Sequence, residues 1–233
     1  MHRTKRIHTL LYSLLLLPNL AFANQESAAQ SITLPTKAFA SKPDVANVNV
    51  SPDGKHIASL VRIDRPGKLG TAINLYNFDT QERSFPVFVE DKKFVISDIY
   101  WANNNILLVE AKFASSLRGT AMIELHLMKY DLRDKKLKPA IPNSFMERLK
   151  YIPNIRSNVI DILPDDPNHF LLQIAGHEYD GEPSVAKIAL ERGGNTHYVQ
   201  AAQNDIFNWQ TDRQGNVRIA IEKKDAVFTT RKR

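Results

Sequence analysis

Glu124 and His126 are the residues of this chain whose types and spacing best fit a general acid–base pair. They alternate with Leu125 and Leu127, so on a strand both polar side chains face the same side of a sheet. A carboxylate beside an imidazole can transfer protons, but neither a nucleophile nor a metal ligand lies near them in the sequence. The simpler interpretation is a polar pair that faces a channel or solvent, because one face of an antiparallel sheet is often exposed to solvent.

Three polar loops raise the question of a metal site. Residues 177–181 read HEYDG, but a zinc-binding pair requires a second histidine four residues after the first, and position 181 is glycine. The loop at 164–168 and the turn at Asp53 supply carboxylates without the spacing of a calcium loop. Asx turns, in which the side chain bonds its own backbone, account for these acidic residues. We therefore predict no catalytic, cofactor-binding or metal-binding residue.

Two tryptophans and one sequon complete the candidate residues. Trp101 and Trp209 each close the first strand of a predicted repeat, where we expect them to pack between repeats. Stacking on a ligand is the alternative role, since tryptophan is enriched at recognition surfaces. Asn49 opens an Asn-Val-Ser glycosylation sequon, to which we assign no role in a chain of bacterial character.

The first 23 residues have the three-part pattern of a secretory signal peptide. Basic residues at Arg3, Lys5 and Arg6 precede an apolar run, and residues 21–23 read AFA, which predicts cleavage after Ala23. A membrane anchor is the alternative, but the run before Pro18 is shorter than the ~20 residues that a spanning helix needs. We expect an exported protein, periplasmic or extracellular in a Gram-negative bacterium, without membrane contact after cleavage.

The net charge of +6 belongs to the two ends of the chain. Half comes from the signal peptide and half from residues 231–233, which leaves a neutral body with interspersed acidic and basic residues. Such a body has no basic stripe for a row of phosphates, so no nucleic-acid partner is expected. Cysteine is absent, which excludes disulfides, thiolate nucleophiles and cysteine-based zinc sites.

Apolar extended runs and polar turns recur in the same order along the chain. A turn at 52–54 joins runs at 48–50 and 57–63, and two further extended runs follow. Comparable returning strands begin after Gly54, Asn105, Asn168 and Gly215, about 50 to 60 residues apart, the length of a propeller blade. Each blade would have two apolar faces and would need neighbours to bury both. A β-sandwich with irregular strands is the alternative.

We therefore predict an all-β fold, a partial β-propeller of about three to four four-stranded blades after an N-terminal signal peptide. The predicted segments are the signal peptide (1–23), an extended lead-in (24–46) and the partial propeller (47–233), with blades at 47–92, 93–142, 155–203 and an incomplete 204–233. Residues 144–151 are predicted to form a loop that crosses between the second and third blades. A short helix is the alternative there, with Ser144 and Glu147 spaced as its capping box and Pro153 as its stop.

Four runs in this order carry a family resemblance: LPTKAFASKPDVANVNVSPDGKHIASL, DIYWANNNILLVEA, VIDILPDDPNHFLLQI and FNWQTDRQGNVRIAI. Over residues 34–225 the chain resembles the N-terminal propeller of bacterial secreted serine peptidases of the prolyl oligopeptidase family. That family places an α/β-hydrolase domain after the propeller, with a Ser-Asp-His triad whose serine lies in a G-x-S-x-G turn. None of the thirteen serines here has both glycines, so no catalytic residue is carried over.

The resemblance implies a non-catalytic, truncated portion of an exported peptidase, inactive alone and without a cofactor. The parent would hydrolyse peptide bonds while its propeller restricts access, and a peptide substrate would be met only through the missing hydrolase domain. The alternative is a stand-alone periplasmic TolB-like propeller that binds a protein partner.

Overall fold

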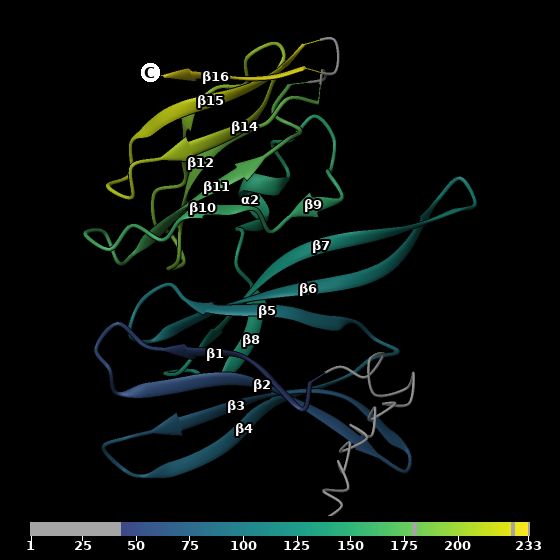
Figure 1. The fold of residues 1–233 in the computed structure, drawn as a ribbon, viewed down its shortest axis with the longest axis vertical. Helices are drawn as coiled ribbons and strands as arrows, with labels where there is room; N and C mark the ends of the chain where they lie inside the picture. The colour runs from purple at the N-terminus through teal and green to yellow at the C-terminus, as the bar shows by residue number, and fades with distance from the viewer. Residues whose placement is uncertain (1–42, 179–180, 225–226, 233) are drawn as a thin grey trace, which may run out of the picture. The chain divides into compact units, whose positions relative to one another are not determined.

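The computed structural model describes residues 43–178, 181–224 and 227–232. The predicted signal peptide and nearly all of the predicted lead-in lie outside the described residues. The described chain is almost entirely β and forms four successive sheets of antiparallel hairpins (Figure 1). This is a partial β-propeller, and the predicted fold class is confirmed. Within the described ranges, no helix is long and apolar enough to cross a membrane.

The first sheet has the order β1-β2-β3-β4, the second β5-β6-β7-β8, the third β10-β11-β12-β13 and the fourth β14-β15-β16. The elements are β1 (Val45–Val50), β2 (His56–Arg65), β3 (Lys68–Asn77), β4 (Glu82–Glu90), β5 (Val95–Trp101), β6 (Ile106–Leu117), β7 (Thr120–Asp131), β8 (Lys136–Pro139), α2 (Asn143–Met146), β9 (Ile155–Arg156), β10 (Val159–Asp161), β11 (His169–Ile174), β12 (Ser184–Ala189), β13 (His197–Gln200), β14 (Ile206–Thr211), β15 (Val217–Lys224) and β16 (Val227–Lys232).

Each strand pairs with the next one along the chain because short polar turns join them. The turn between β1 and β2 shows the local cause, since Gly54 has a φ of 70° that a residue with a Cβ rarely adopts. The carboxylate of Asp53 accepts the hydroxyl hydrogen of Ser51 at 2.6 Å and the amide of Lys55 at 3.1 Å. Asp53 therefore forms the predicted Asx turn.

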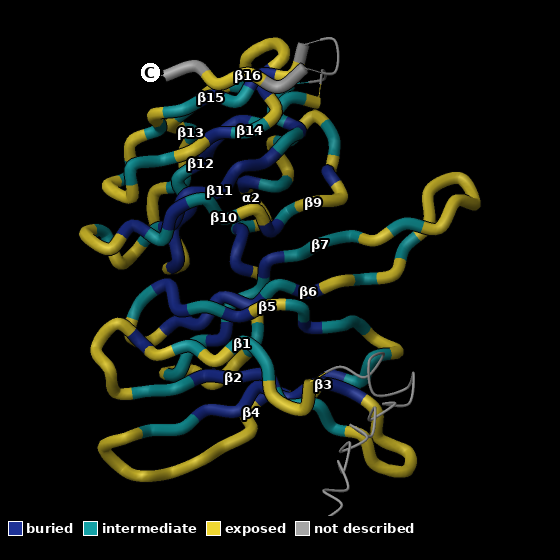
Figure 2. Tube along the Cα trace, in the orientation of Figure 1, coloured by how far each residue is buried: buried dark blue, intermediate teal, exposed yellow. Residues whose placement is uncertain are grey.

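Three hydrophobic clusters occupy the spaces between successive sheets. Neighbouring residues on one strand serve different clusters: Leu107 packs toward the first sheet and Leu108 toward the third. In the same way, Leu172 joins the cluster between sheets two and three, and Leu171 the cluster between sheets three and four. The buried centres of these strands are dark blue in Figure 2. Burying each such side chain contributes about 1.5 to 3 kcal/mol, which explains why these strands read as continuous apolar runs rather than alternating ones.

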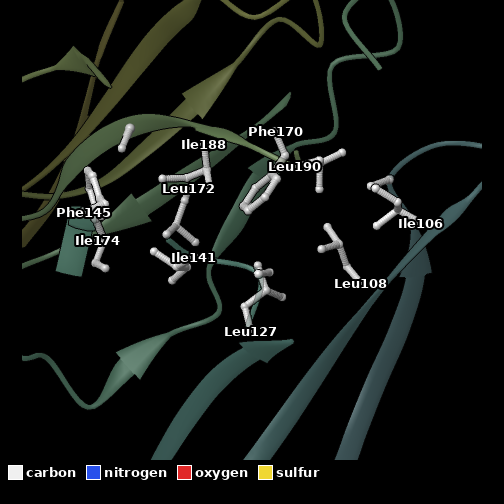
Figure 3. Packing of buried hydrophobic residues seen from close by; sticks show 13 residues of the cluster. Ile106, Leu108, Leu127, Ile141, Phe145, Phe170, Leu172, Ile174, Ile188 and Leu190 are labelled. Carbon is white, nitrogen blue, oxygen red and sulfur yellow. The ribbon is translucent and has the colours of Figure 1, made fainter. Parts of the chain in front are cut away.

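The largest cluster joins the second and third sheets and includes the segment that connects them. Phe145 of α2 and Ile141 lie among strand residues of both sheets (Figure 3). The segment predicted as a loop contains a short helix, the alternative for this segment, and the capping box considered for that helix does not form. The helix begins after Pro142 as N-cap, without a side-chain cap, and ends at Met146 well before Pro153. Burial of Phe145, which is 1% exposed, holds this short turn in place of a cap.

The second sheet has two features that the repeat did not predict. Its hairpin β6–β7 pairs along twelve residues of each strand and extends beyond the neighbouring strands in Figure 1. In addition, β9 pairs in parallel with β7, at Leu125 and His126, outside the regular four-strand order. The short strand therefore covers a two-residue part of the β7 edge that β8 leaves open.

Candidate functional site

Glu124 and His126 face the same side of β7, as predicted, and they contact each other. The Nε2 atom of His126 donates to Oε2 of Glu124 at 2.9 Å, because a carboxylate only accepts. The other carboxylate oxygen accepts the hydroxyl hydrogen of Ser115 on β6 at 2.8 Å. The ring of His126 also lies against Phe113, with centroids 4.4 Å apart. The pair is thus half-enclosed, with each side chain 29% exposed.

Arg156 on β9 completes this cluster. Its guanidinium donates to Oε2 of Glu124 and lies beside the imidazole of His126. The parallel pairing of β9 with β7 places Arg156 next to His126 in register. Sequence analysis missed Arg156 because nothing in the local pattern IRS indicates which strand it joins.

The order of these groups is not that of a catalytic triad. In a Ser-His-Asp triad the imidazole lies between the other two groups and takes the serine proton. Here the carboxylate of Glu124 lies in the middle, and Ser115 donates to it rather than to His126. The hydrogen bonds from His126 and Ser115 lower the pKa of Glu124, so the carboxylate is a weak base. Across the described residues, no serine hydroxyl bonds a histidine ring.

A second carboxylate of β6 is bound by two serines. Glu110 accepts the hydroxyl hydrogen of Ser97 at 2.5 Å through Oε1 and that of Ser157 at 2.7 Å through Oε2. Ser157 follows Arg156 directly, so two consecutive residues anchor the same short segment through separate carboxylates. Burial, followed by the charge of Glu110, raises the pKa of the Tyr100 hydroxyl. Sequence analysis missed both serines and Glu110, since single polar residues in apolar strands carry no positional signal.

Both tryptophans pack between sheets, and each also bonds the sheet before its own. The indole N–H of Trp101 donates to the carbonyl of Asn49 at 3.2 Å, and that of Trp209 to the carbonyl of Pro183 at 2.7 Å. Trp209 is fully buried and Trp101 is 4% exposed. The predicted packing role is confirmed. The carboxamide of Asn49 donates to the carbonyl of Ile99, also across two sheets.

The other predicted loop residues have structural contacts. Asp166, in the loop 164–168, accepts from His169 at 2.9 Å and pairs with Lys187 at 2.6 Å. Its carboxylate therefore binds other side chains, and the predicted Asx turn is wrong for this residue because the His169 ring and the Lys187 ammonium lie within reach. His177 packs on Tyr198, with ring centroids 4.0 Å apart. In the part of the chain that the structure describes, no group of three or more His, Cys, Asp or Glu residues is placed to hold a metal.

The two distinctive loops of the sequence meet in space. The side-chain amide of Asn103, in the WANNN turn, donates to the carbonyl of Pro167 in the PDDPN loop at 2.6 Å. The carbonyl oxygen of the same side chain accepts the amides of Asn105 and Ile106 at 2.9 Å each. One side chain thus shapes its own turn and joins the second sheet to the third.

No protein-family model and no curated protein matches the chain. Among solved structures it is similar to TolB from Acinetobacter baumannii, with 12% identity and a TM-score of 0.43 over 81% of this chain and 41% of that one. It is similar to an acylaminoacyl peptidase from Pyrococcus horikoshii, with 12% identity and a TM-score of 0.39 over 81% and 37%. An acylaminoacyl peptidase in complex with a chloromethyl ketone has 12% identity and a TM-score of 0.33 over 78% and 42%. The chain spans about two fifths of the length of these proteins.

Proposed function

We propose that this chain is the non-catalytic N-terminal propeller portion of an exported serine peptidase of the prolyl oligopeptidase type. The parent protein hydrolyses peptide bonds by acyl transfer to a serine of a separate α/β-hydrolase domain. The propeller restricts entry to short or unstructured peptides. The chain itself meets peptide only through that domain and takes no cofactor.

One observation carries this proposal: polar side chains join successive sheets at their first strands. Asn47 of β1 donates to the carbonyl of Ser97 on β5 at 3.2 Å. The hydroxyl of Thr211 on β14 donates to the carbonyl of Ile160 on β10 at 3.3 Å. First strands held together in this way support a role as the wall of a passage, because the first strands of propeller blades surround the central channel.

The polar cluster at Glu124 supports a role without catalysis. Its serine and its histidine both bond the carboxylate, so no group is free to activate Ser115 as a nucleophile. Arg156 adds a positive charge that holds the carboxylate ionised. The cluster fixes β9 on the second sheet, which is sufficient to explain its residues.

Two experiments test the proposal. We expect the purified chain to resist labelling by a fluorophosphonate probe and to leave fluorogenic peptides intact, and labelling of any serine contradicts the non-catalytic role. Sequencing of the genomic DNA beyond codon 233 is expected to find a G-x-S-x-G turn in one of the three frames. Unrelated genes there, together with a cooperative monomeric melt above ~45 °C, favour the stand-alone TolB-like binding module instead.

A further inference from the structure

A broad cleft opens between the second and third sheets, away from the cluster at Glu124. Its volume is about 1280 Å³. One wall consists of the ends of β7 and β8, and the other of the turn between β12 and β13. The start of α2 and the residues before it close the cleft between these walls. A cavity of this size is large enough for a small organic ligand.

Basic side chains outnumber acidic ones in the lining of this cleft. The basic residues are Lys129, Lys136, Lys138, Arg148 and Arg192. The acidic residues are Asp131, Asp134 and Glu191. The body of the chain is neutral as a whole, so this excess of positive charge is local.

The three carboxylates are paired with two cations, Arg133 and Lys138. Arg133 binds Asp131 at 2.7 Å and Glu191 at 2.6 Å, and thereby joins the two walls. Lys138 binds Asp134. Among the described residues, Lys129, Lys136, Arg148 and Arg192 take part in no ion pair, although all four line the cleft. The charge that remains unbalanced is therefore positive and lies on both walls.

Lys129 is the least exposed of these cations. It lies on β7, and its ammonium donates to the backbone carbonyl of Leu190 on the third sheet. Burial lowers the pKa of Lys129, because desolvation disfavours the charged form. The charges of Glu191, Asp131 and Asp134 offset only part of this desolvation, and an anion beside the ammonium would offset more of it.

We propose that this cleft binds a small polyanion that carries two or more phosphate or carboxylate groups. Lys129 on β7 holds one anionic group, and Arg192, on the opposite wall, holds another. The side chains of Ser144 and Asn195 also line the cleft and supply neutral donors. This site is independent of the proposed peptidase role, since it needs neither a hydrolase domain nor the cluster at Glu124.

Isothermal titration calorimetry of the full chain, at about 50 mM NaCl to limit screening, tests the proposal. The probes are tripolyphosphate and citrate, which distinguish phosphate from carboxylate ligands. Orthophosphate and acetate, each with a single phosphate or carboxylate group, are the references. We expect at least one polyanion to bind at least about tenfold more tightly than its reference. Absence of binding by both polyanions, or equal affinity for references and polyanions, overturns the proposal.

Variants locate the site. Lys129→Met removes the ammonium but keeps an unbranched side chain of similar length. This variant is expected to bind the polyanion about tenfold more weakly, the effect of losing one charge-assisted hydrogen bond. Arg192→Gln, on an exposed turn where folding is not at risk, is expected to weaken it in the same direction. Lys93→Met is the control, because Lys93 is exposed in the turn between β4 and β5, does not line the cleft, and its loss changes the net charge equally. An equal loss in the control, or no loss in either cleft variant, overturns the proposal.

Discussion

The indole N–H of Trp209, on the first strand of the fourth sheet, donates to the carbonyl of Pro183, which directly precedes β12 of the third sheet, 2.7 Å away. Trp209 is fully buried, so its ring fills the space between the two sheets and its only polar atom is satisfied there. The contact stabilises one sheet against the next in a fold where no sheet can bury both of its faces alone.

Replacement of this tryptophan is expected to weaken the packing between the last two sheets. Trp209→Phe removes the donor, leaves the Pro183 carbonyl unpaired and opens a small cavity, so the free energy of unfolding falls by about 2 to 4 kcal/mol. Urea denaturation followed by circular dichroism measures the change. Phe85→Leu, at a ring that is 50% exposed, is the control and is expected to change little. A loss below about 0.5 kcal/mol in Trp209→Phe, the range of a surface substitution, contradicts the role assigned to the ring.

The ion pair between Arg156 and Glu124 is expected to hold β9 on the second sheet. The Arg156 side chain is 15% exposed, so Arg156→Met leaves a partly buried carboxylate without its cation and lowers stability by about 2 kcal/mol. Arg133→Met is the control, since Arg133 is 53% exposed and its pairs are expected to contribute at most about 1 kcal/mol. In a double-mutant cycle, Glu124→Gln should recover part of the loss. Strict additivity of the two changes would show that the pair has no coupling.

Asn103 allows two functions of one side chain to be measured separately. Asn103→Asp keeps the oxygen that accepts the amides of its own turn but replaces the donor to Pro167 with an acceptor. Asn103→Ala removes both functions. We expect a loss of about 1 kcal/mol for the aspartate variant and about 2 kcal/mol for the alanine variant in urea denaturation. If the aspartate variant is as stable as the parent, the bond between the two loops contributes nothing.

Asp166 is expected to make the protein sensitive to acid. Hydrogen bonds from His169 and then Lys187 lower the pKa of Asp166 to about 2. A depressed folded-state pKa gives stability that is present above the unfolded value of 3.8 and is lost as the pH falls through about 2. Because the side chain is 33% exposed, screening reduces the contribution to about 1 kcal/mol.

The acid limb of the stability curve measures this effect. Asp166→Asn should be about 1 kcal/mol less stable than the parent at pH 5 and should approach it near pH 2, because the parent then loses the same charge. Asp165→Asn, at the exposed neighbour, is the control and should follow the parent throughout. A constant difference between Asp166→Asn and the parent from pH 5 to pH 2 would rule out the carboxylate as its source.

Local sequence pattern was sufficient where the fold depends on neighbours in the chain. The strands around Leu107 and Leu171 read as apolar on both faces, and the structure confirms that each face packs on a different sheet. The turn at Asp53 and Gly54 was predicted for the same reason, since a turn depends on the φ angles and side chains of about four consecutive residues. The loop predicted at 144–151 instead contains a helical turn that begins before Ser144, because burial of Phe145 determines where that turn forms.

The sequence by itself determined the stacked strands, the turns between them and the place of Trp101 and Trp209, because periodicity and turn chemistry act over a few residues. Only the tertiary structure decided that Arg156 and Ser157 meet the carboxylates of Glu124 and Glu110, and that Lys129 faces Leu190. These partners lie 32, 47 and 61 residues apart. Side chains at such separations come together through the packing of whole sheets, which no local pattern records.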